Sequence, residues 1–282
     1  MKKLFSLLLV VVLLMPSATS VFAATSSEED LKADVVDYMV AVNAQIGYFM
    51  SDEELLVLAD QVQASAVTYS DQYDISMEQA YAMLLSELRT SLPLSEGIQS
   101  RSGSAALKQL PTATTGDIFF VDSDSAWNHV GLYQSTAIIV ESMPADGVQF
   151  WSIYSQESYQ APVTDPADGS NDSCILRVSS LSQTSRNSAA VWPRNNVTAG
   201  TPYDYDFLNN KADFYMVNQG SLDMPYYVTY PESDAYNCSE LVWKAFKKTA
   251  GVDLDHNGGL GVYPNDIYNS SLTVKTNTTW WQ

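Results

Sequence analysis

Two cysteines and two histidines are the residues with which this chain could build a nucleophile and its base. They are Cys174, Cys238, His129 and His256, so a thiol and an imidazole can be combined in four ways. A four-ligand zinc site would consume all of them, and none of their spacings is that of a C-x-x-C or H-x-x-x-H motif. Two cysteines allow one disulfide bridge at most, which excludes a disulfide-rich scaffold.

Cys238 is the better placed of the two thiols. It lies in the sequence YNCSEL, at the start of a helix that we predict over residues 235–250. The unpaired N–H groups and the positive dipole end of a helix start stabilise a thiolate, the nucleophilic form of cysteine. Cys174 falls inside an apolar segment typical of a strand, where burial favours the inert thiol. A disulfide between the two cysteines remains open as an alternative.

His129 is the better base of the two histidines. It opens a predicted strand directly after a polar turn, so its ring can face a cleft while the next residue points into the core. His256 follows Cys238 across a whole helix and its turn. At about 1.5 Å per residue, that separation is too large for a hydrogen bond to the thiol.

Glu141 is the candidate for the group that orients the imidazole and selects its tautomer. It ends the strand that should pair with the His129 strand. A hairpin centred near Ser135 would bring the two side chains to the same open end of the pair. Asn128 and Asp124 are weaker candidates for this role, and an ordinary solvated glutamate at a strand end is the alternative.

The elements that must position these residues are those of an α+β domain. From residue 116 onward, short apolar segments alternate with polar or Gly- and Pro-containing turns, as in an antiparallel meander. Helical periodicity returns only in two later segments, and a meander with segregated helices is an α+β fold. We expect strands at 117–121, 129–133, 137–141, 147–151 and 174–178, and helices at 180–191 and 235–250.

The part of the chain before this domain is predicted to be helical over residues 24–92. Capping signals followed by apolar residues at helical spacing predict three helices, which begin near Ser27, Ser51 and Ser76. Such helices would form a small bundle or layer. They contain no Cys or His, so we assign them no chemistry. Packing on the next domain, regulating access to it and acting as an inert spacer all remain open.

A linker is predicted over residues 93–115, where Ser, Thr, Gly and Pro are frequent. It separates the helical region from the domain at 116–282. Arg101 and Lys108 would make it a protease target if the helical region were a removable pro-segment.

Residues 1–23 have the pattern of a bacterial signal peptide. Lys2 and Lys3 form a positive n-region, residues 4–15 are almost wholly apolar, and a small-residue cleavage site ends at Ala23. We therefore expect an exported protein that is secreted or associated with the cell envelope. An uncleaved N-terminal anchor is the alternative. No later segment is long and apolar enough to cross a bilayer.

The acidic composition limits the choice of partner. Thirty-three acidic residues against 14 basic ones give a formal net charge of −19. Nucleic acid and anionic membrane surfaces are therefore poor partners, because binding them requires Lys and Arg to replace counterions. A hydrophobic content of 46% is ample for a packed core.

A loop after the Cys238 helix could have a second use. Asp253, Asp255 and Asn257, followed by Gly258, match the first half of an EF-hand calcium loop. Pro264 stands at loop position 12, where an EF-hand has its bidentate glutamate. A calcium site and a polar turn held by Asx hydrogen bonds are both open. No other cofactor is expected.

Taken together, these residues make the chain resemble the circularly permuted papain-like cysteine hydrolases. The resemblance is to the YiiX-like branch of the NlpC superfamily and, more distantly, to lecithin–retinol acyltransferase-like enzymes. In that family the base strand precedes the nucleophile helix, the reverse of papain order, and this sequence has the reversed order. The resemblance covers roughly residues 116–282 and not the helical region. It is carried by the ordered set GDIF at 116–119, HVGLY at 129–133, VES at 140–142, GTPYD at 200–204 and YNCSELV at 236–242.

The resemblance implies an antiparallel β-meander or barrel packed on helices, with a Cys238–His129–Glu141 triad acting as a cysteine peptidase or amidase. The thiolate would attack an amide, ester or thioester carbonyl, with the Cys238 N–H as oxyanion donor. Tyr203 would add a hydroxyl donor or, as an equal alternative, serve as core packing. Asn237 would line the substrate wall, where many relatives carry a bulkier residue. A peptide, cell-wall peptide or acyl compound is the expected substrate. A catalytically inactive binding module and a lipid acyltransferase or thioesterase remain open as alternatives.

Overall fold

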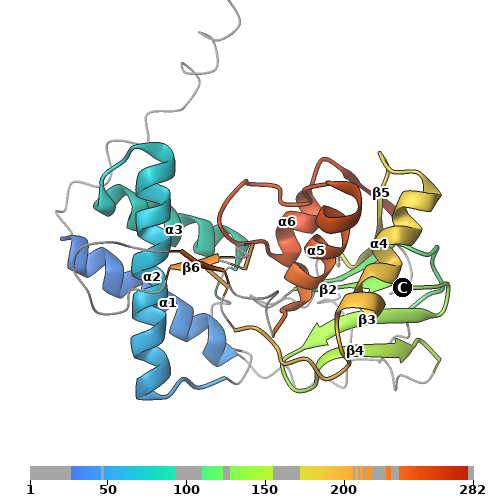
Figure 1. The fold of residues 1–282 in the computed structure, drawn as a ribbon, viewed down its shortest axis with the longest axis horizontal. Helices are drawn as coiled ribbons and strands as arrows, with labels where there is room; N and C mark the ends of the chain where they lie inside the picture. Colours follow the sequence, from blue (N-terminus) through green and yellow to red (C-terminus); the bar gives the residue numbers. More distant parts are fainter. Residues whose placement is uncertain are drawn as a thin grey trace, which may run out of the picture.

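The computed structural model describes most of the chain between residues 27 and 278. The described residues are 27–45, 48–92, 94, 110–122, 128–154, 172–205, 207–208, 210–211, 214–216, 227–229 and 235–278. The predicted signal peptide, most of the predicted linker and Asp124 lie outside them. The N-terminal helices gather on one side of the molecule, and the sheet with its own helices lies on the other (Figure 1).

The N-terminal helices are α1 (Glu28–Gln45), α2 (Asp52–Tyr73) and α3 (Met77–Ser91). The predicted caps are confirmed, because the Ser51 and Ser76 side chains accept the N–H of Glu54 and Gln79, whose side chains bond back to the cap backbone. Residues at helical spacing turn one face of each helix inward. The resulting cluster includes Val35, Met39, Val42, Leu58, Val62, Ala66, Leu84 and Leu88.

A mainly antiparallel sheet follows the helices, and its described strands pair in the order β4-β3-β2-β1-β5-β8. The five strands expected from the sequence are confirmed, whereas the sixth, β8, was not predicted. A separate ribbon is formed by β6 and β7. The strands are β1 (Ile118–Val121), β2 (His129–Tyr133), β3 (Ile138–Met143), β4 (Gly147–Ser152), β5 (Cys174–Val178), β6 (Phe214–Met216), β7 (Tyr227–Thr229) and β8 (Thr273–Asn277).

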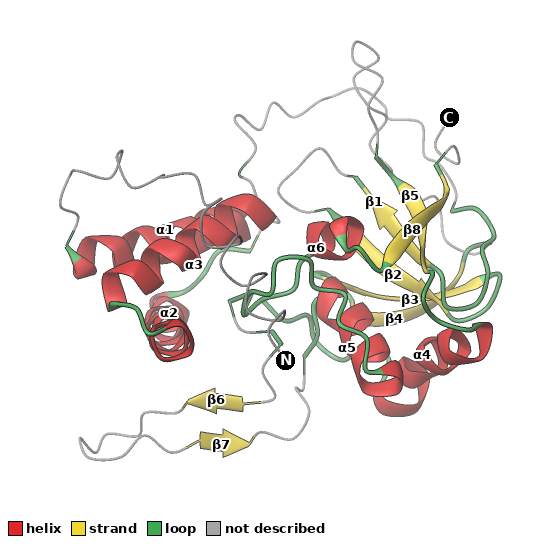
Figure 2. Cartoon of the chain, turned by 90° about the horizontal axis from the view of Figure 1, so that it is seen from above, coloured by secondary structure: helices red, strands yellow, loops and turns green. Residues whose placement is uncertain are grey.

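Alternation along the strands gives the sheet two buried faces. Side chains of one face, such as Phe120 and Val130, pack with three helices. These helices are α4 (Gln183–Asn196), α5 (Cys238–Ala250) and α6 (Pro264–Asn269). Phe119, Tyr133 and their equivalents form a second cluster on the other face. Figure 2 shows α4 and α5 lying along one face of the sheet. The fold is therefore α+β, as expected.

The helical region also packs against the sheet domain. The cluster of α1 to α3 continues into Tyr203, Phe207, Leu208 and Tyr263, which belong to loops of the sheet domain. Hydrogen bonds join the end of α3 to these loops, for example from Asn257 Nδ2 to the Ser91 hydroxyl at 3.2 Å. Among the described residues, no helix has the length and apolarity needed to cross a bilayer.

Candidate active site

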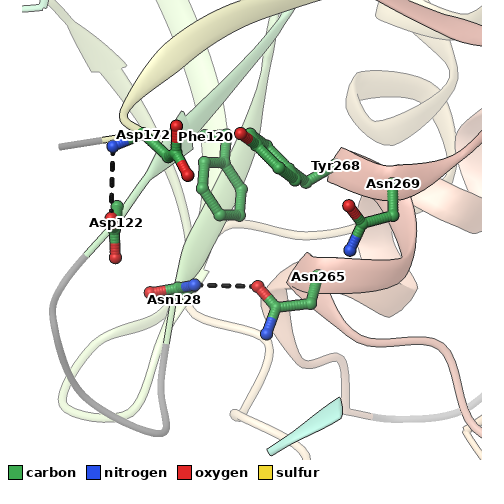
Figure 3. Close-up of a pocket in the computed structure, with 7 residues that line it drawn as sticks. All are labelled: Phe120, Asp122, Asn128, Asp172, Asn265, Tyr268 and Asn269. Atoms are coloured by element: carbon green, nitrogen blue, oxygen red, sulfur yellow. Dashed lines mark hydrogen bonds between the residues drawn. The ribbon is translucent and has the colours of Figure 1, made fainter. Parts of the chain in front are cut away.

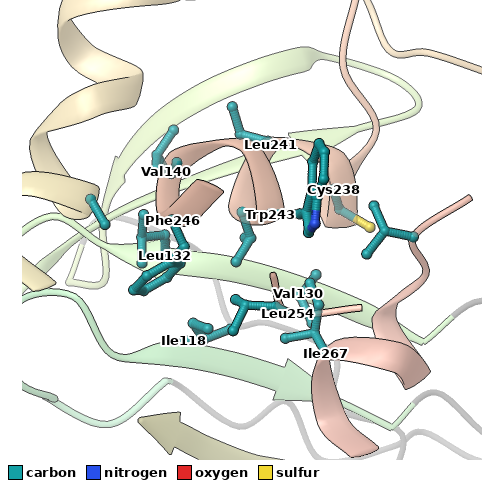
Figure 4. Packing of buried hydrophobic residues seen from close by; sticks show 14 of the residues in the cluster. Ile118, Val130, Leu132, Val140, Cys238, Leu241, Trp243, Phe246, Leu254 and Ile267 are labelled. Atoms are coloured by element: carbon teal, nitrogen blue, oxygen red, sulfur yellow. The ribbon is translucent and has the colours of Figure 1, made fainter. Parts of the chain in front are cut away.

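Helix α5 begins at Cys238 because Asn237 caps it. The Asn237 Oδ1 accepts the Glu240 N–H at 2.9 Å, and the Glu240 carboxylate accepts the Asn237 N–H at 3.3 Å. This capping box starts the helix three residues later than the sequence suggested and places Cys238 at its first position. Figure 4 shows the sulfur at that first turn, at the end of the apolar cluster to which Leu241 and Phe246 belong.

His129 and Glu141 meet across the β2–β3 hairpin. The ring Nε2 of His129 lies 2.8 Å from Glu141 Oε2, and the side chains are 15% and 1% exposed. Leu132 pairs with Val140. Extending this register sets Glu141 opposite Gly131, two residues from His129 on the same face. The hairpin is therefore centred one residue later than predicted, and the two side chains meet diagonally.

A hydrogen bond joins His129 to Cys238. With Nε2 engaged by Glu141, Nδ1 is the ring nitrogen left for the thiol. Burial of the ring opposes its charge, but the charge of Cys238, its hydrogen bond and Glu141 outweigh burial and raise the pKa of His129 to about 10. Cys238 and Glu141 therefore favour the imidazolium form of His129.

Tyr203 brings a second donor to the thiol. Its hydroxyl hydrogen-bonds to Cys238, and the residue is buried. Burial, and then the charge of Cys238, raise the pKa of Tyr203 well above 10, so the hydroxyl keeps its proton. The preceding residue, Pro202, is fixed to the segment just before Cys238, because the Tyr236 N–H donates to the Pro202 carbonyl at 3.0 Å.

Asn237 has a structural task that the sequence analysis did not assign to it. It is fully buried, and its Oδ1 also accepts the Ser239 hydroxyl at 2.9 Å. Within the described part of the chain, no hydrogen bond reaches its Nδ2. Asn237 therefore fixes the start of α5, and its role as a substrate wall stays a prediction.

The remaining Cys, His and Asn candidates lie apart from this site. Cys174 is buried in β5, where burial raises the pKa of its thiol to about 12. Both cysteines are free, so they form no bridge with each other. His256 is exposed in the loop after α5. Asn128 Nδ2 donates to Asn265 Oδ1 at 2.8 Å.

The loop with the EF-hand-like pattern is a chain of Asx turns. The N–H of Asp255 donates to Asp253 Oδ1 at 3.2 Å, that of Asn257 to Asp255 Oδ1 at 3.1 Å, and that of Gly259 to Asn257 Oδ1 at 2.8 Å. Of the two alternatives left open by the sequence, the polar turn is the arrangement that the structure contains.

Lysines neutralise the carboxylates of this loop. Lys211 contacts Asp255 Oδ2 at 2.5 Å, and Lys247 contacts Asp253 Oδ2 at 2.8 Å. Over the described residues, no group of three or more His, Cys, Asp or Glu side chains is arranged to hold a metal ion. Asp253 and Asp255 are thus paired with lysines, and a calcium site at Asp253, Asp255 and Asn257 stays a prediction.

Two supports of the site were missed by sequence reasoning. The Ser142 hydroxyl donates to the Tyr236 carbonyl at 2.6 Å, which ties β3 to the nucleophile segment. Glu240 and Lys244 form an ion pair at 2.8 Å with both side chains 2% exposed. Burial, and then the charge of Asp204, raise the pKa of Glu240 to about 8. The i,i+4 spacing of Glu240 and Lys244 was the only sequence signal for this pair.

A hollow of about 250 Å³ lies beside the end of β1 and the start of β2, against α6 (Figure 3). Asn128, which directly precedes His129, bonds Asn265 across its rim. Its lining combines two carboxylates, three carboxamides and two aromatic rings. The lining residues are Phe120, Asp122, Asn128, Asp172, Asn265, Tyr268 and Asn269.

Comparison with known proteins gave one curated relative and one solved structure. The uncharacterized protein YycO of Bacillus subtilis (strain 168) is 33% identical over 233 residues, which are 81% of this chain and 81% of that protein. The crystal structure of metalloprotein yiiX from Escherichia coli O157:H7 matches with 15% identity and a TM-score of 0.39, over 60% of this chain and 99% of that chain. No protein-family model matches the chain.

Proposed function

This chain belongs to the family of YycO, and on that premise we propose that it is an exported cysteine hydrolase that cleaves an amide or related acyl bond. The name of the relative states no activity, so the arrangement of the site residues is the basis for this function. The observation that supports it is the convergence of His129 and Tyr203 on Cys238, with Glu141 behind the imidazole. This arrangement supports the assignment of Cys238 as an activated thiol nucleophile.

In the first half of the reaction, the Cys238 thiolate attacks the carbonyl carbon of the substrate. A carbon–sulfur bond forms, and the carbonyl π electrons move onto oxygen. The Cys238 backbone N–H, unpaired at the first position of α5, and the Tyr203 hydroxyl are the donors that stabilise this oxyanion. Collapse of the intermediate breaks the bond to the leaving group, which takes its proton from the His129 imidazolium.

In the second half, water releases the acyl group. The neutral His129 ring removes a proton from the water as its oxygen attacks the thioester, and the Cys238 sulfur then leaves as thiolate. Glu141 holds the ring by its Nε2 at 2.8 Å and stabilises the imidazolium in both halves. The Glu141 carboxylate is 1% exposed, so it is shielded from competing solvent.

The substrate class that we propose is a peptide of the bacterial cell envelope. Support comes from the signal-like residues 1–23, which would deliver the protein to that compartment. The net charge of −19 disfavours polyanionic substrates such as nucleic acid. Hydrolysis and transfer to a lipid acceptor share the acyl-enzyme, so product analysis in the presence of both acceptors separates them.

The test compares the purified protein with Cys238→Ala and with Cys174→Ala, a matched loss of the other thiol. Iodoacetamide labelling at pH 7 and hydrolysis of p-nitrophenyl acetate and of cell-wall peptides are measured. We expect Cys238→Ala to lose at least about 10³-fold in hydrolysis and Cys174→Ala to retain it. Full activity in Cys238→Ala would refute the nucleophile assignment. Slow labelling of the wild-type Cys238 would favour an inactive binding module.

A further inference from the structure

A stack of three tyrosines connects the N-terminal helices to the candidate nucleophile. Tyr48, which lies between α1 and α2, stacks on Tyr205 with ring centroids 3.9 Å apart and planes inclined by 12°. The ring of Tyr205 meets that of Tyr203 edge-on at 5.0 Å. The Tyr203 hydroxyl bonds to Cys238. One continuous set of contacts therefore runs from the helical region to the sulfur atom.

Tyr48 and Tyr205, the first two members of the stack, are anchored by their hydroxyls. The Tyr48 hydroxyl donates to Glu54, the same carboxylate that completes the capping box of α2. The Tyr205 hydroxyl donates to the Pro144 carbonyl at 3.0 Å, in the turn between β3 and β4. The ring of Tyr205 is thus fixed from the helical region on one side and from the sheet on the other.

The packing of Tyr203 also comes from the helical region. Residues 201–205 have no regular secondary structure, and backbone hydrogen bonds hold Thr201 and Pro202 to the sheet domain. The side-chain neighbours of Tyr203 add to this support. Tyr203 is part of the apolar cluster built by α1 to α3, together with Phe207 and Tyr263, whereas Cys238 belongs to the cluster between α5 and the sheet. The hydrogen bond between Tyr203 and Cys238 therefore joins two separately packed units.

We propose that the N-terminal helical region is a working part of the active site, which positions the Tyr203 hydroxyl on Cys238 through the Tyr48–Tyr205–Tyr203 stack. Tyr48 and Tyr205 are then positioning residues, which act through Tyr203 and touch no reacting atom. This inference rests on the proposed function of Cys238. It assigns a role to the region that the sequence left as a spacer, a regulator or a removable pro-segment. Removal of the region would take away the residues of α1 to α3 from the cluster to which Tyr203 belongs.

The test is a double-mutant cycle on the full chain. Tyr203→Phe removes the donor, Tyr48→Ala removes the end of the stack, and the third variant combines them. The rate of Cys238 alkylation by iodoacetamide at pH 7 and the kcat and KM for p-nitrophenyl acetate are measured. The free energy of a hydrogen bond to a charged group corresponds to a change in rate of about tenfold or more. We therefore expect about a tenfold loss of rate in Tyr203→Phe. Tyr48→Ala should lose several-fold in kcat at an unchanged KM.

The double variant shows whether Tyr48 acts through the Tyr203 hydroxyl. If Tyr48 acts only through the Tyr203 hydroxyl, the double variant should match Tyr203→Phe alone, because the two changes remove one interaction. Losses that multiply would overturn the proposal, and so would a wild-type rate in Tyr48→Ala. If wild-type Cys238 is itself unreactive, the proposed function fails together with this inference. If wild-type Cys238 is reactive and Tyr48→Ala reacts at the same rate, only the inference about the tyrosine stack is refuted.

Two control variants separate positioning from general damage. Tyr48→Phe keeps the stacked ring and loses only the hydroxyl bond to Glu54. It should therefore react at close to the wild-type rate. Tyr73→Ala removes a tyrosine that stacks on Tyr69 at 5.6 Å, away from the active site. It should leave the rate unchanged while lowering stability to a similar extent as Tyr48→Ala. A rate loss in Tyr73→Ala equal to that in Tyr48→Ala would show that destabilisation, rather than positioning, is responsible.

Discussion

The titration of His129 offers a direct test of the site geometry. The chain contains two histidines, so each ring can be followed separately. The neighbouring charges of Cys238 and Glu141 overcome burial and raise the pKa of His129 from 6.5 to about 10. We therefore predict that its ring stays protonated across the neutral range, in which an ordinary histidine loses its proton.

The size and sign of the effect on stability follow from this pKa. A rise from 6.5 to about 10 corresponds to about 5 kcal/mol in favour of the charged ring, at about 1.4 kcal/mol for each pH unit. Because the folded-state pKa of His129 is raised, its contribution to stability is complete below about pH 6.5. It is then lost as the pH rises toward 10, since the unfolded chain releases the proton first.

Two substitutions should lower the pKa of His129 in a defined order. The charge of Cys238 and its hydrogen bond are the largest causes that raise the pKa, and those from Glu141 are smaller. Cys238→Ala should therefore lower it most, and Glu141→Gln should lower it less. In Cys238→Ala, Glu141 is left to oppose the effect of burial on the ring.

Proton NMR of histidine-labelled protein between pH 5 and 11 measures these values. The exposed His256 supplies the second ring signal, which His256→Gln assigns by its disappearance. A wild-type His129 that titrates near 6.5 would refute the arrangement in which Cys238 and Glu141 stabilise its protonated ring. So would a Cys238→Ala variant with an unchanged pKa, because no contact with the sulfur could then be raising it.

Two further predictions concern the packing around the site. Burial, and then the charge of Asp255, raise the pKa of Asp266 to about 7. The folded protein therefore favours the protonated Asp266, and this contribution to stability is lost as the pH rises from about 4 to 7. Asp266→Asn should make the urea midpoint fall less over that pH range. An identical dependence of the midpoint on pH in both proteins would contradict this. A Cβ at Gly131 would lie 2.3 Å from the Phe119 ring and 2.9 Å from the Val140 carbonyl oxygen. Gly131→Ala should thus lower the free energy of unfolding by about 1–3 kcal/mol, and an unchanged denaturant midpoint would count against this packing.

The parts of the site that sequence could predict are encoded by short-range patterns. Ser51 and Ser76 are followed at the right spacing by the residues that complete their capping boxes. The pairing of His129 with Glu141 is likewise local, because one hairpin joins their strands. The hairpin centre was wrong by one residue, since turn geometry rather than the apolar pattern fixes the register.

The parts that sequence could not predict depend on residues far apart in the chain. Lys211, which neutralises Asp255, lies 44 residues earlier in the chain. The sequence pattern of the acidic loop therefore could not predict this lysine as a partner. The position of Tyr203 depends on Tyr205 and Tyr48, the latter in a region where the sequence indicated no chemistry. Strand β8 lacks a buried apolar face, because most of its residues are exposed, so its periodicity gave no signal.

The contact between Cys238 and His129 is in turn a product of core packing. The hairpin that carries His129 and Glu141 forms its own hydrogen bond, but the thiol arrives on a helix much later in the chain. Val130, which directly follows His129, belongs to the same buried cluster as Leu241 and Cys238 (Figure 4). The apolar face of α5 therefore sets the distance between sulfur and imidazole, and the order in which base and nucleophile occur along the chain places no constraint on it. A permuted order can supply the same chemistry, because the core and not the sequence order assembles the pair.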